Sequence, residues 1–206
     1  MRALILVDIQ NDFLPGGALA VPRGDRVLAP ANRLQPRFDL CCATQDWHPE
    51  GHGSFASSHP GKQPGERIEL GGLDQILWPD HCVQGSRGAE LGSLLDTRRV
   101  EAIFRKGTDA QVDSYSGFFD NAERKATGLA DYLRGRGANE LYVLGLATDY
   151  CVKATALDAR KLGFPAVAVI EDACAAVELR PGDAAAALEA LRAAGVRVIS
   201  SSALLV

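Results

Sequence analysis

The feature that most constrains this chain is the alternation of short apolar runs with longer segments of helical pattern. Six runs rich in Val, Ile, Leu and Ala stand out, at residues 3–7, 40–43, 102–105, 141–144, 166–170 and 196–199. Continuous apolar runs of this length are typical of parallel strands that are buried on both faces. The pattern therefore predicts an α/β fold with six parallel strands and helices on both faces of the sheet.

The second half of the chain has the most regular pattern. Helices are predicted at 129–134, 149–162 and 183–194, and the last two end just before Gly163 and Gly195, where a left-handed residue can close a helix. Between residues 44 and 100 the pattern fails, and Gly, Pro, Ser and His crowd the chain. Long irregular segments inside a domain often carry function. No linker or repeat interrupts the chain, so residues 1–206 are expected to form a single domain.

The charge and the composition of the chain argue against nucleic acid and membranes as binding partners. The formal net charge of −4 gives no basic surface for nucleic acid or for anionic lipid. Asp8 interrupts the first apolar run before it reaches the length of a signal peptide, and no apolar stretch approaches the ~20 residues of a spanning helix. The five cysteines form no CxxC pair, and their odd number leaves a thiol unpaired. A cytoplasmic protein with a small-molecule partner is expected, and the sequence leaves a homo-oligomer open.

Cys151 is the first candidate for chemistry. The run 141–144 leads into a turn of small residues and then into the helix that Thr148 or Asp149 would cap. Cys151 then lies in the first turn, where backbone N–H groups and the helix dipole are expected to lower its pKa below about 8.5. The same N–H groups would suit an oxyanion. The alternative is that Cys151 is a small buried residue without reactivity.

Asp8 and Lys106 are the second and third candidates. Each follows an apolar run, at the carboxyl edge where open α/β sheets bind their ligands. Taken alone, Asp8 is equally explained as a turn or cap residue, and Lys106 as a solvated surface charge. Together with Cys151 they offer a base, an ammonium group and a thiol, and a lysine can keep the carboxylate ionised. We expect folding to bring these three side chains together.

A second group of residues has the spacing of a metal site. Asp46 and His48 are two apart at a strand end, so both side chains leave the same face, and His81 would supply a third ligand. One carboxylate and two imidazoles suit a site for zinc, iron or manganese with open positions. The alternative is ordinary hydrogen bonding in loops. His59 is expected to be structural or exposed, and so is His52, although His52 is the better candidate for a further ligand or for the partner of a ligand.

Three aromatic residues lie close in sequence to these polar groups. Phe13 follows Asp8, Trp78 precedes His81, and Tyr115 stands a short loop beyond Lys106. Each is explained equally well as part of the core. As a set they favour a flat cavity that accepts a ring.

The segments that carry these residues resemble the bacterial nicotinamidases, within the isochorismatase-like cysteine hydrolases. They are ALILVDIQNDFLPGGALAV, TQDWHPEGHGSFASSHPG, LWPDHCVQGSRGAEL, FRKGTDAQVDSYSGFFDN and LYVLGLATDYCVKATALDA, which span nearly the whole chain. VDxQxDF with a later ATDxCV is typical of the superfamily, whereas DWH with WPxHC indicates nicotinamidases.

This resemblance implies a three-layer αβα sandwich around the six-stranded sheet. It also implies a hydrolase that converts nicotinamide to nicotinic acid and ammonia in NAD salvage, acts on pyrazinamide, and passes through a cysteine thioester. The residues that match the family pattern are a catalytic triad of Asp8, Lys106 and Cys151, an oxyanion hole from the N–H groups of Ala147 and Cys151, metal ligands Asp46, His48 and His81 for one divalent ion, and a substrate pocket with Phe13, Trp78 and Tyr115. A cis peptide bond between Leu146 and Ala147 is implied as well.

Two other functions remain as alternatives. The chain is either another amidohydrolase of the same superfamily, which needs no metal, or a non-catalytic relative that uses Cys151 as a redox sensor. The DWH and WPDHC segments argue against the first, and a complete triad argues against the second.

Overall fold

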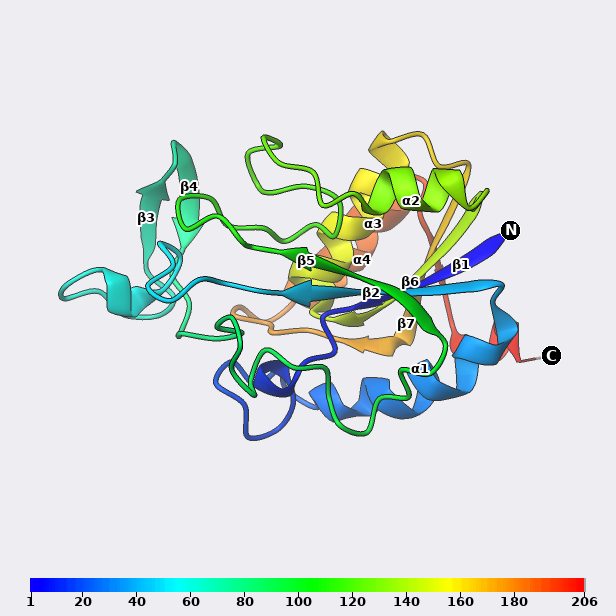
Figure 1. The fold of residues 1–206 in the computed structure, drawn as a ribbon, viewed down its shortest axis with the longest axis horizontal. Helices are drawn as coiled ribbons and strands as arrows, with labels where there is room; N and C mark the ends of the chain where they lie inside the picture. The colour runs from blue at the N-terminus through cyan, green and yellow to red at the C-terminus, as the bar shows by residue number, and fades with distance from the viewer. Residues whose placement is uncertain (206) are drawn as a thin grey trace.

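Six strands form one parallel sheet in the computed structural model, which describes residues 1–205. The strands are β1 (Arg2–Val7), β2 (Leu40–Asp46), β5 (Val100–Lys106), β6 (Glu140–Leu146), β7 (Ala166–Ala175) and β8 (Arg197–Ile199). Their order across the sheet is β5-β2-β1-β6-β7-β8, and neighbouring strands pair in parallel (Figure 1). Each predicted apolar run overlaps one of these strands, so the predicted sheet is confirmed.

Helices cover both faces of the sheet. α1 (Leu28–Leu34) lies on one face, and α2 (Leu129–Gly135), α3 (Lys153–Lys161) and α4 (Asp183–Ala193) lie on the other (Figure 1). The central strand β1 is buried from Ala3 onward, which explains why its sequence is apolar without alternation. The arrangement is the predicted three-layer αβα sandwich.

The predicted helix at 149–162 differs in its first turn. Thr148–Val152 form a π-helical turn, in which the Val152 N–H donates to the Ala147 carbonyl at 3.1 Å, and α3 begins only afterwards. Gly163, at φ +82°, follows the helix as predicted. Helix α1 was not predicted, because it is only seven residues long and contains Pro30.

The irregular region between β2 and β5 contains a hairpin that the sequence pattern did not reveal. β3 (Arg67–Leu70) and β4 (Leu73–Ile76) pair antiparallel through Gly71 and Gly72, both at positive φ. The hairpin projects beyond the carboxyl ends of the central strands (Figure 1). Short helical turns of the 3₁₀ type complete the described chain, at Asn11–Phe13, Gly24–Val27, Gln35–Arg37, Ala56–Ser58 and Ser201–Leu204.

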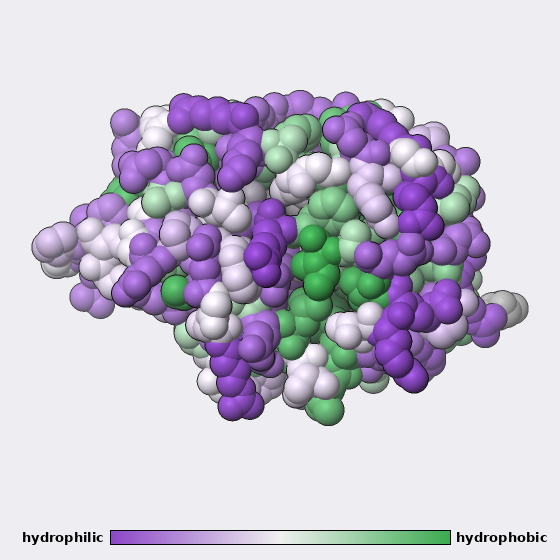
Figure 2. All heavy atoms as spheres, in the orientation of Figure 1, coloured by the Kyte–Doolittle hydropathy of each residue, from purple (hydrophilic) through white to green (hydrophobic). Residues whose placement is uncertain are grey.

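Most of the visible surface is polar. Figure 2 shows one narrow apolar stripe on the face over β5 and the segment before it. The large exposed apolar side chains include Ile103 on β5 and Leu94 in that segment, which are 48% and 74% exposed. None of the helices within residues 1–205 combines the length and the apolar character needed to cross a bilayer.

Candidate active site

The predicted polar residues gather at the carboxyl ends of four neighbouring strands. Lys106 ends β5, Asp46 ends β2, Asp8 follows β1, and Cys151 follows β6. The chain builds outward from β1 to β2 and β5 on one side and then continues with β6 on the other, so the sheet reverses its winding between β1 and β6. Ligands of open α/β sheets bind at such a switch point. Asp8 and Cys151 lie on its two sides.

Lys106 is the centre of this group. Its ammonium lies 2.9 Å from Asp8 Oδ2, 2.5 Å from Asp46 Oδ1 and 3.5 Å from the Cys151 sulfur, and it also donates to the Ser114 carbonyl at 2.9 Å. The Asp8, Asp46 and Lys106 side chains are almost completely withdrawn from solvent. The structure therefore brings together the thiol, the carboxylate and the ammonium group that lie far apart in the sequence.

Asp8 is held by Thr44 on β2. The Thr44 hydroxyl donates to Asp8 Oδ1 at 2.7 Å and accepts the Asp8 N–H at 3.2 Å. The other oxygen, Oδ2, is buried and forms no well-directed hydrogen bond within the described residues, although Lys106 is close to it. A carboxylate oxygen of Asp8 and the Cys151 sulfur lie within 4.8 Å of each other. The Asp8 carboxylate and the Cys151 sulfur are thus neighbours in the buried cluster.

Burial and charge set the protonation of the three charged groups. Burial alone would lower the pKa of Lys106, but the Asp46 and Asp8 carboxylates outweigh it and hold that pKa well above the ordinary value. Burial raises the pKa of Asp8, and Asp46 raises it further against the opposing effect of Lys106. For Asp46 the opposite holds: despite burial, Lys106 and His48 keep its pKa well below the usual range. Lys106 and Asp46 therefore form a buried ion pair, and Asp8 is the carboxylate of this cluster whose pKa is raised.

The prediction of a lowered pKa for Cys151 is wrong for this structure. Burial raises the pKa of the thiol well above its ordinary value, and the carboxylates of Asp8 and Asp46 add to this effect. The Lys106 ammonium lowers the pKa of Cys151, but by less than burial and the carboxylates raise it. The physical reason is that the sulfur is enclosed, and an unsolvated anion beside two carboxylates is costly. Cys151 thus rests as a thiol and needs a base, which the neighbouring Asp8 can provide.

A second cluster lies next to this one and shares Asp46 with it. Oδ2 of Asp46, on the side away from Lys106, is 3.5 Å from His48 Nε2 and 3.7 Å from His81 Nε2. The Nδ1 atom of His48 lies 2.9 Å from the Gly107 carbonyl, and that of His81 lies 2.7 Å from the Pro79 carbonyl. A carbonyl only accepts, so each Nδ1 carries a proton, and each Nε2 faces Oδ2 of Asp46.

These three residues fit a divalent metal ion. One ligand atom from each of Asp46, His48 and His81 lies within 4.8 Å of the others. His48 Nε2 is buried without a hydrogen-bond partner among residues 1–205, which is costly unless something else binds it. A donor set of two imidazoles and one carboxylate suits zinc, iron or manganese.

The two remaining histidines, His52 and His59, hydrogen-bond to nearby loop residues and contribute no ligand to the cluster of Asp46, His48 and His81. His52 is buried, and its Nε2 donates to the Asp109 carbonyl at 2.7 Å while its Nδ1 accepts from the Ser54 hydroxyl at 2.8 Å. Both nitrogens are occupied, so in this structure His52 packs beside the His48 ring at 4.5 Å between centroids without a free lone pair. His59 bonds to the Gly53 carbonyl at 2.8 Å.

A cavity with aromatic walls opens beside the Cys151 sulfur. Phe13, Trp78 and Tyr115 line it, as do Ala147 and the metal-site residues Asp46 and His81. Its further walls are residues that the sequence reasoning missed, namely Leu19, Asp113, Tyr150 and Val177. Tyr150 packs edge-on against Trp78 at 4.9 Å between ring centroids. Tyr150 directly precedes Cys151 in the sequence, and this position could have identified it as a pocket residue.

The turn that carries Cys151 begins with an unusual peptide bond. The bond between Leu146 and Ala147 is cis, as the resemblance implied. The Ala147 carbonyl accepts the N–H groups of Tyr150 and Val152 at 3.1 Å each, which closes the turn. Ala147 and Cys151 consequently face the same cavity.

Known proteins resemble this chain in sequence and in fold. A model of the isochorismatase domain matches residues 2–203. A nicotinamidase from Escherichia coli strain K12 is 54% identical over 198 residues, 94% of this chain and 92% of that protein. The solved structure of an Acinetobacter baumannii nicotinamidase and pyrazinamidase has a TM-score of 0.95 at 47% identity, covering 98% of this chain and 97% of that one.

A pyrazinamidase from Pyrococcus horikoshii, solved in complex with zinc, is 39% identical with a TM-score of 0.78, covering 97% of this chain and 98% of that one. The match of the family model thus extends over nearly all of the described residues, including the strand ends that hold Asp8, Asp46, Lys106 and Cys151. The chain belongs to the isochorismatase family.

Proposed function

We propose that this chain is a nicotinamidase, which hydrolyses nicotinamide to nicotinic acid and ammonia through a thioester on Cys151. The observation that carries the proposal is the position of the Cys151 sulfur, between the Asp8 and Lys106 side chains and a cavity walled by aromatic rings. The 54% identity to the Escherichia coli nicotinamidase supports the choice of substrate.

The first step is proton transfer within the buried cluster. Asp8 takes the proton of the Cys151 thiol, and the Lys106 ammonium, 3.5 Å from the sulfur, stabilises the thiolate as it forms. Because the pKa of Asp8 is raised by burial, this carboxylate is a stronger base than an exposed aspartate. The thiolate then attacks the carboxamide carbon.

The oxygen of the tetrahedral intermediate accepts hydrogen bonds from the N–H groups of Ala147 and Cys151. One such donor contributes about 10² to 10³ in rate. The carbon–nitrogen bond breaks as protonated Asp8 gives its proton to the leaving nitrogen, which departs as ammonia. Asp8 then removes a proton from water, the resulting hydroxide attacks the thioester carbon, and the carbon–sulfur bond breaks. The proton returns to sulfur as nicotinic acid leaves.

The pocket orients the ring for these steps. Phe13 and Trp78 would hold the pyridine ring between them, and Tyr115 would close one side. Asp46, His48 and His81 would hold one divalent ion, zinc, iron or manganese, which when bound supplies a Lewis-acid contact that orients the ring nitrogen of the substrate. Asp46 would serve both sites, since its Oδ1 neutralises Lys106 and its Oδ2 faces the histidines.

The test is release of ammonia from nicotinamide by protein purified without chelators, with Cys151→Ala as the control. Pyrazinamide should also be hydrolysed, whereas benzamide, which lacks the ring nitrogen, should be a poor substrate. No ammonia from metal-loaded intact protein would reject the proposal, and oxidation-dependent binding of a partner protein in its place would favour a thiol sensor. Equal rates with benzamide would reject the assigned role of the ring nitrogen.

A further inference from the structure

Asp149, two residues before Cys151, has a role that the sequence did not predict. Neither the π-helical turn nor α3 has a side-chain cap, so the expected cap by Thr148 or Asp149 is absent. Asp149 is nevertheless buried, with only 4% of the residue exposed. Its Oδ1 accepts the Val177 N–H at 3.1 Å, and its Oδ2 accepts the Glu178 N–H at 2.8 Å. The carboxylate therefore binds a segment that begins 28 residues further along the chain.

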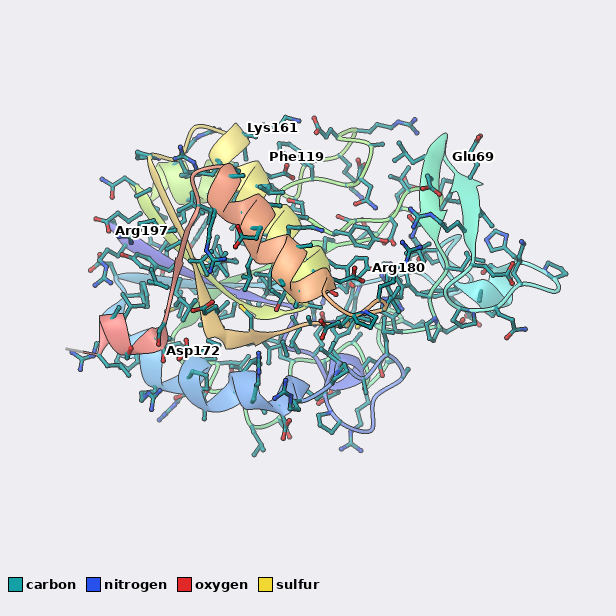
Figure 3. All side chains as sticks on the ribbon, turned by 180° about the vertical axis from the view of Figure 1, so that it is seen from behind. Glu69, Phe119, Lys161, Asp172, Arg180 and Arg197 are labelled. Carbon is teal, nitrogen blue, oxygen red and sulfur yellow. The ribbon has the colours of Figure 1, made fainter. Side chains whose placement is uncertain are left out.

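The segment that Asp149 binds connects β7 to α4. In Figure 3 this segment runs from β7 to Arg180 and then turns back into α4. The backbone of residues 177–179 forms no other hydrogen bond to the rest of the chain within residues 1–205. Glu178 has φ +56°, a conformation that residues other than glycine rarely adopt. The two hydrogen bonds to Asp149 are thus the polar contacts that fix this backbone.

Val177 is a wall of the catalytic cavity. It lines the cavity together with Phe13, Trp78 and Cys151, and its side chain packs against the hydrophobic core. The N–H that donates to Asp149 Oδ1 belongs to Val177 itself. This hydrogen bond therefore fixes the backbone directly beside the atom that carries the side chain.

The turn that presents Cys151 keeps its own hydrogen bonds without the Asp149 side chain. The Ala147 carbonyl accepts the N–H groups of Tyr150 and Val152 at 3.1 Å each. Loss of the Asp149 carboxylate would therefore free the segment after β7 and leave the turn closed. The effect on the cavity wall can thus be separated from an effect on the nucleophile.

We propose that Asp149 is a positioning residue, whose carboxylate fixes Val177 against the ring of the substrate and so sets the affinity of the cavity for a pyridine carboxamide. The inference depends on the proposed function, because it names how that site holds its substrate. Bonds break and form at the carboxamide and not in the ring, so the contact with Val177 is the same in the ground state and in the transition state. Loss of this contact should raise KM and leave kcat nearly unchanged.

The experiment is a double-mutant cycle with Asp149→Asn, Val177→Ala and the variant that carries both substitutions. Asp149→Asn keeps the shape of the side chain, but an NH₂ group replaces one oxygen and cannot accept a backbone N–H. Asp172→Asn is the matched control. Asp172 also accepts a backbone N–H, that of Ser201 at 2.7 Å, but it does not line the cavity and lies apart from Arg180 in Figure 3. The kcat and the KM for nicotinamide are measured for each protein.

Asp149→Asn and Val177→Ala should each raise KM about fivefold, while kcat stays within about threefold of the intact chain and Asp172→Asn changes neither. Because Val177 is no longer fixed in Asp149→Asn, the further change Val177→Ala should alter KM by less than about twofold. Effects that multiply to about 25-fold would mean that the two residues act independently, which would overturn the inference. An unchanged KM in Asp149→Asn, or an equal rise in Asp172→Asn, would overturn it as well.

Hydrogen exchange in the intact chain tests the anchor without any substitution. Relative to their intrinsic rates, the amide protons of Val177 and Glu178 should exchange more slowly than that of Leu179, whose N–H has no acceptor among residues 1–205. Equal relative rates would refute the anchor, even if Asp149→Asn does not fold. If the intact chain releases no ammonia from nicotinamide, the proposed function fails, whereas the exchange rates still report on the anchor.

Discussion

The His48 ring lies against Gly107, the residue that directly follows Lys106 on β5. Its Nδ1 donates to the Gly107 carbonyl at 2.9 Å, and a Cβ added at position 107 would lie 2.4 Å from Cε1 of the ring. The strand that presents the ammonium group therefore also fixes the orientation of an imidazole in the neighbouring cluster.

Gly107→Ala should weaken the metal site more than it weakens the fold. The backbone at this position has φ +66°, so the substitution should cost about 1–3 kcal/mol in unfolding free energy, and the added methyl group must displace His48. We expect metal affinity to fall about 10- to 100-fold. Gly163→Ala is the matched control, since φ is +82° there but no atom lies within 4 Å of the added Cβ. Equal metal contents in the two variants would contradict the role of Gly107.

His81→Ala should reduce the metal bound per chain in protein purified without chelators, measured by atomic emission. The variant removes one of three ligand groups and leaves Asp46 and His48. His59→Ala is its control, because His59 hydrogen-bonds the Gly53 carbonyl and belongs to none of the metal-ligand clusters within residues 1–205. A stoichiometry that stays the same in His81→Ala would remove this residue from the ligand set.

Replacement of Cys151 by serine should lower kcat by at least about 10⁴-fold, because a hydroxyl is a far weaker nucleophile than a thiol at this site. Mass spectrometry of the intact protein during turnover should detect a nicotinoyl adduct, and its absence from Cys151→Ser should locate the adduct. Cys174→Ser serves as the comparison, since Cys174 is buried and donates to the Ile170 carbonyl. Substantial turnover in Cys151→Ser would exclude the thioester route.

The acidic limb of the profile of kcat/KM against pH should report the ionisation of Asp8. The base is active when ionised, and burial raises its pKa above the ordinary value of 3.8, so activity should be lost as pH falls through that raised pKa. Thr44→Val removes a hydrogen bond that lowers the pKa of Asp8, so the limb should move to higher pH. Thr155→Val should leave it in place, because Thr155 bonds the Gly117 N–H instead. A limb that does not move in Thr44→Val would argue that another group titrates.

Much of the fold was predictable because the central strands are buried on both faces. Leu4 and Ile5, and their partners Cys41 and Cys42, have no polar positions to obscure the pattern. The extent of β2 was not predictable in the same way. Its last three residues, Thr44–Asp46, are polar and fall where the apolar pattern ends, yet they are buried: Thr44 and Asp46 belong to the site, and Gln45 donates to the Ala89 carbonyl at 2.8 Å.

The residues of the candidate site were found from their position at strand ends, but their electrostatics were not. The place of Cys151 in a helical turn suggested a stable thiolate, whereas its protonation depends on how deeply the sulfur is enclosed and on two carboxylates from other strands. Sequence spacing carries no information on either. The occupation of both His52 nitrogens likewise depends on Ser54 and Asp109, which only the folded chain brings to the ring.

The order of the strands in the sheet explains how four residues far apart in the sequence come to lie together. Lys106, Asp46, Asp8 and Cys151 come from β5, β2, β1 and β6, which are consecutive in the sheet. Adjacent strands are about 4.8 Å apart, so long side chains at their carboxyl ends, such as that of Lys106, reach groups on the neighbouring strands. A protein engineer who grafts this chemistry onto another scaffold would therefore need four adjacent parallel strands with the winding reversed before the last, together with the turn Thr148–Val152 that carries Cys151.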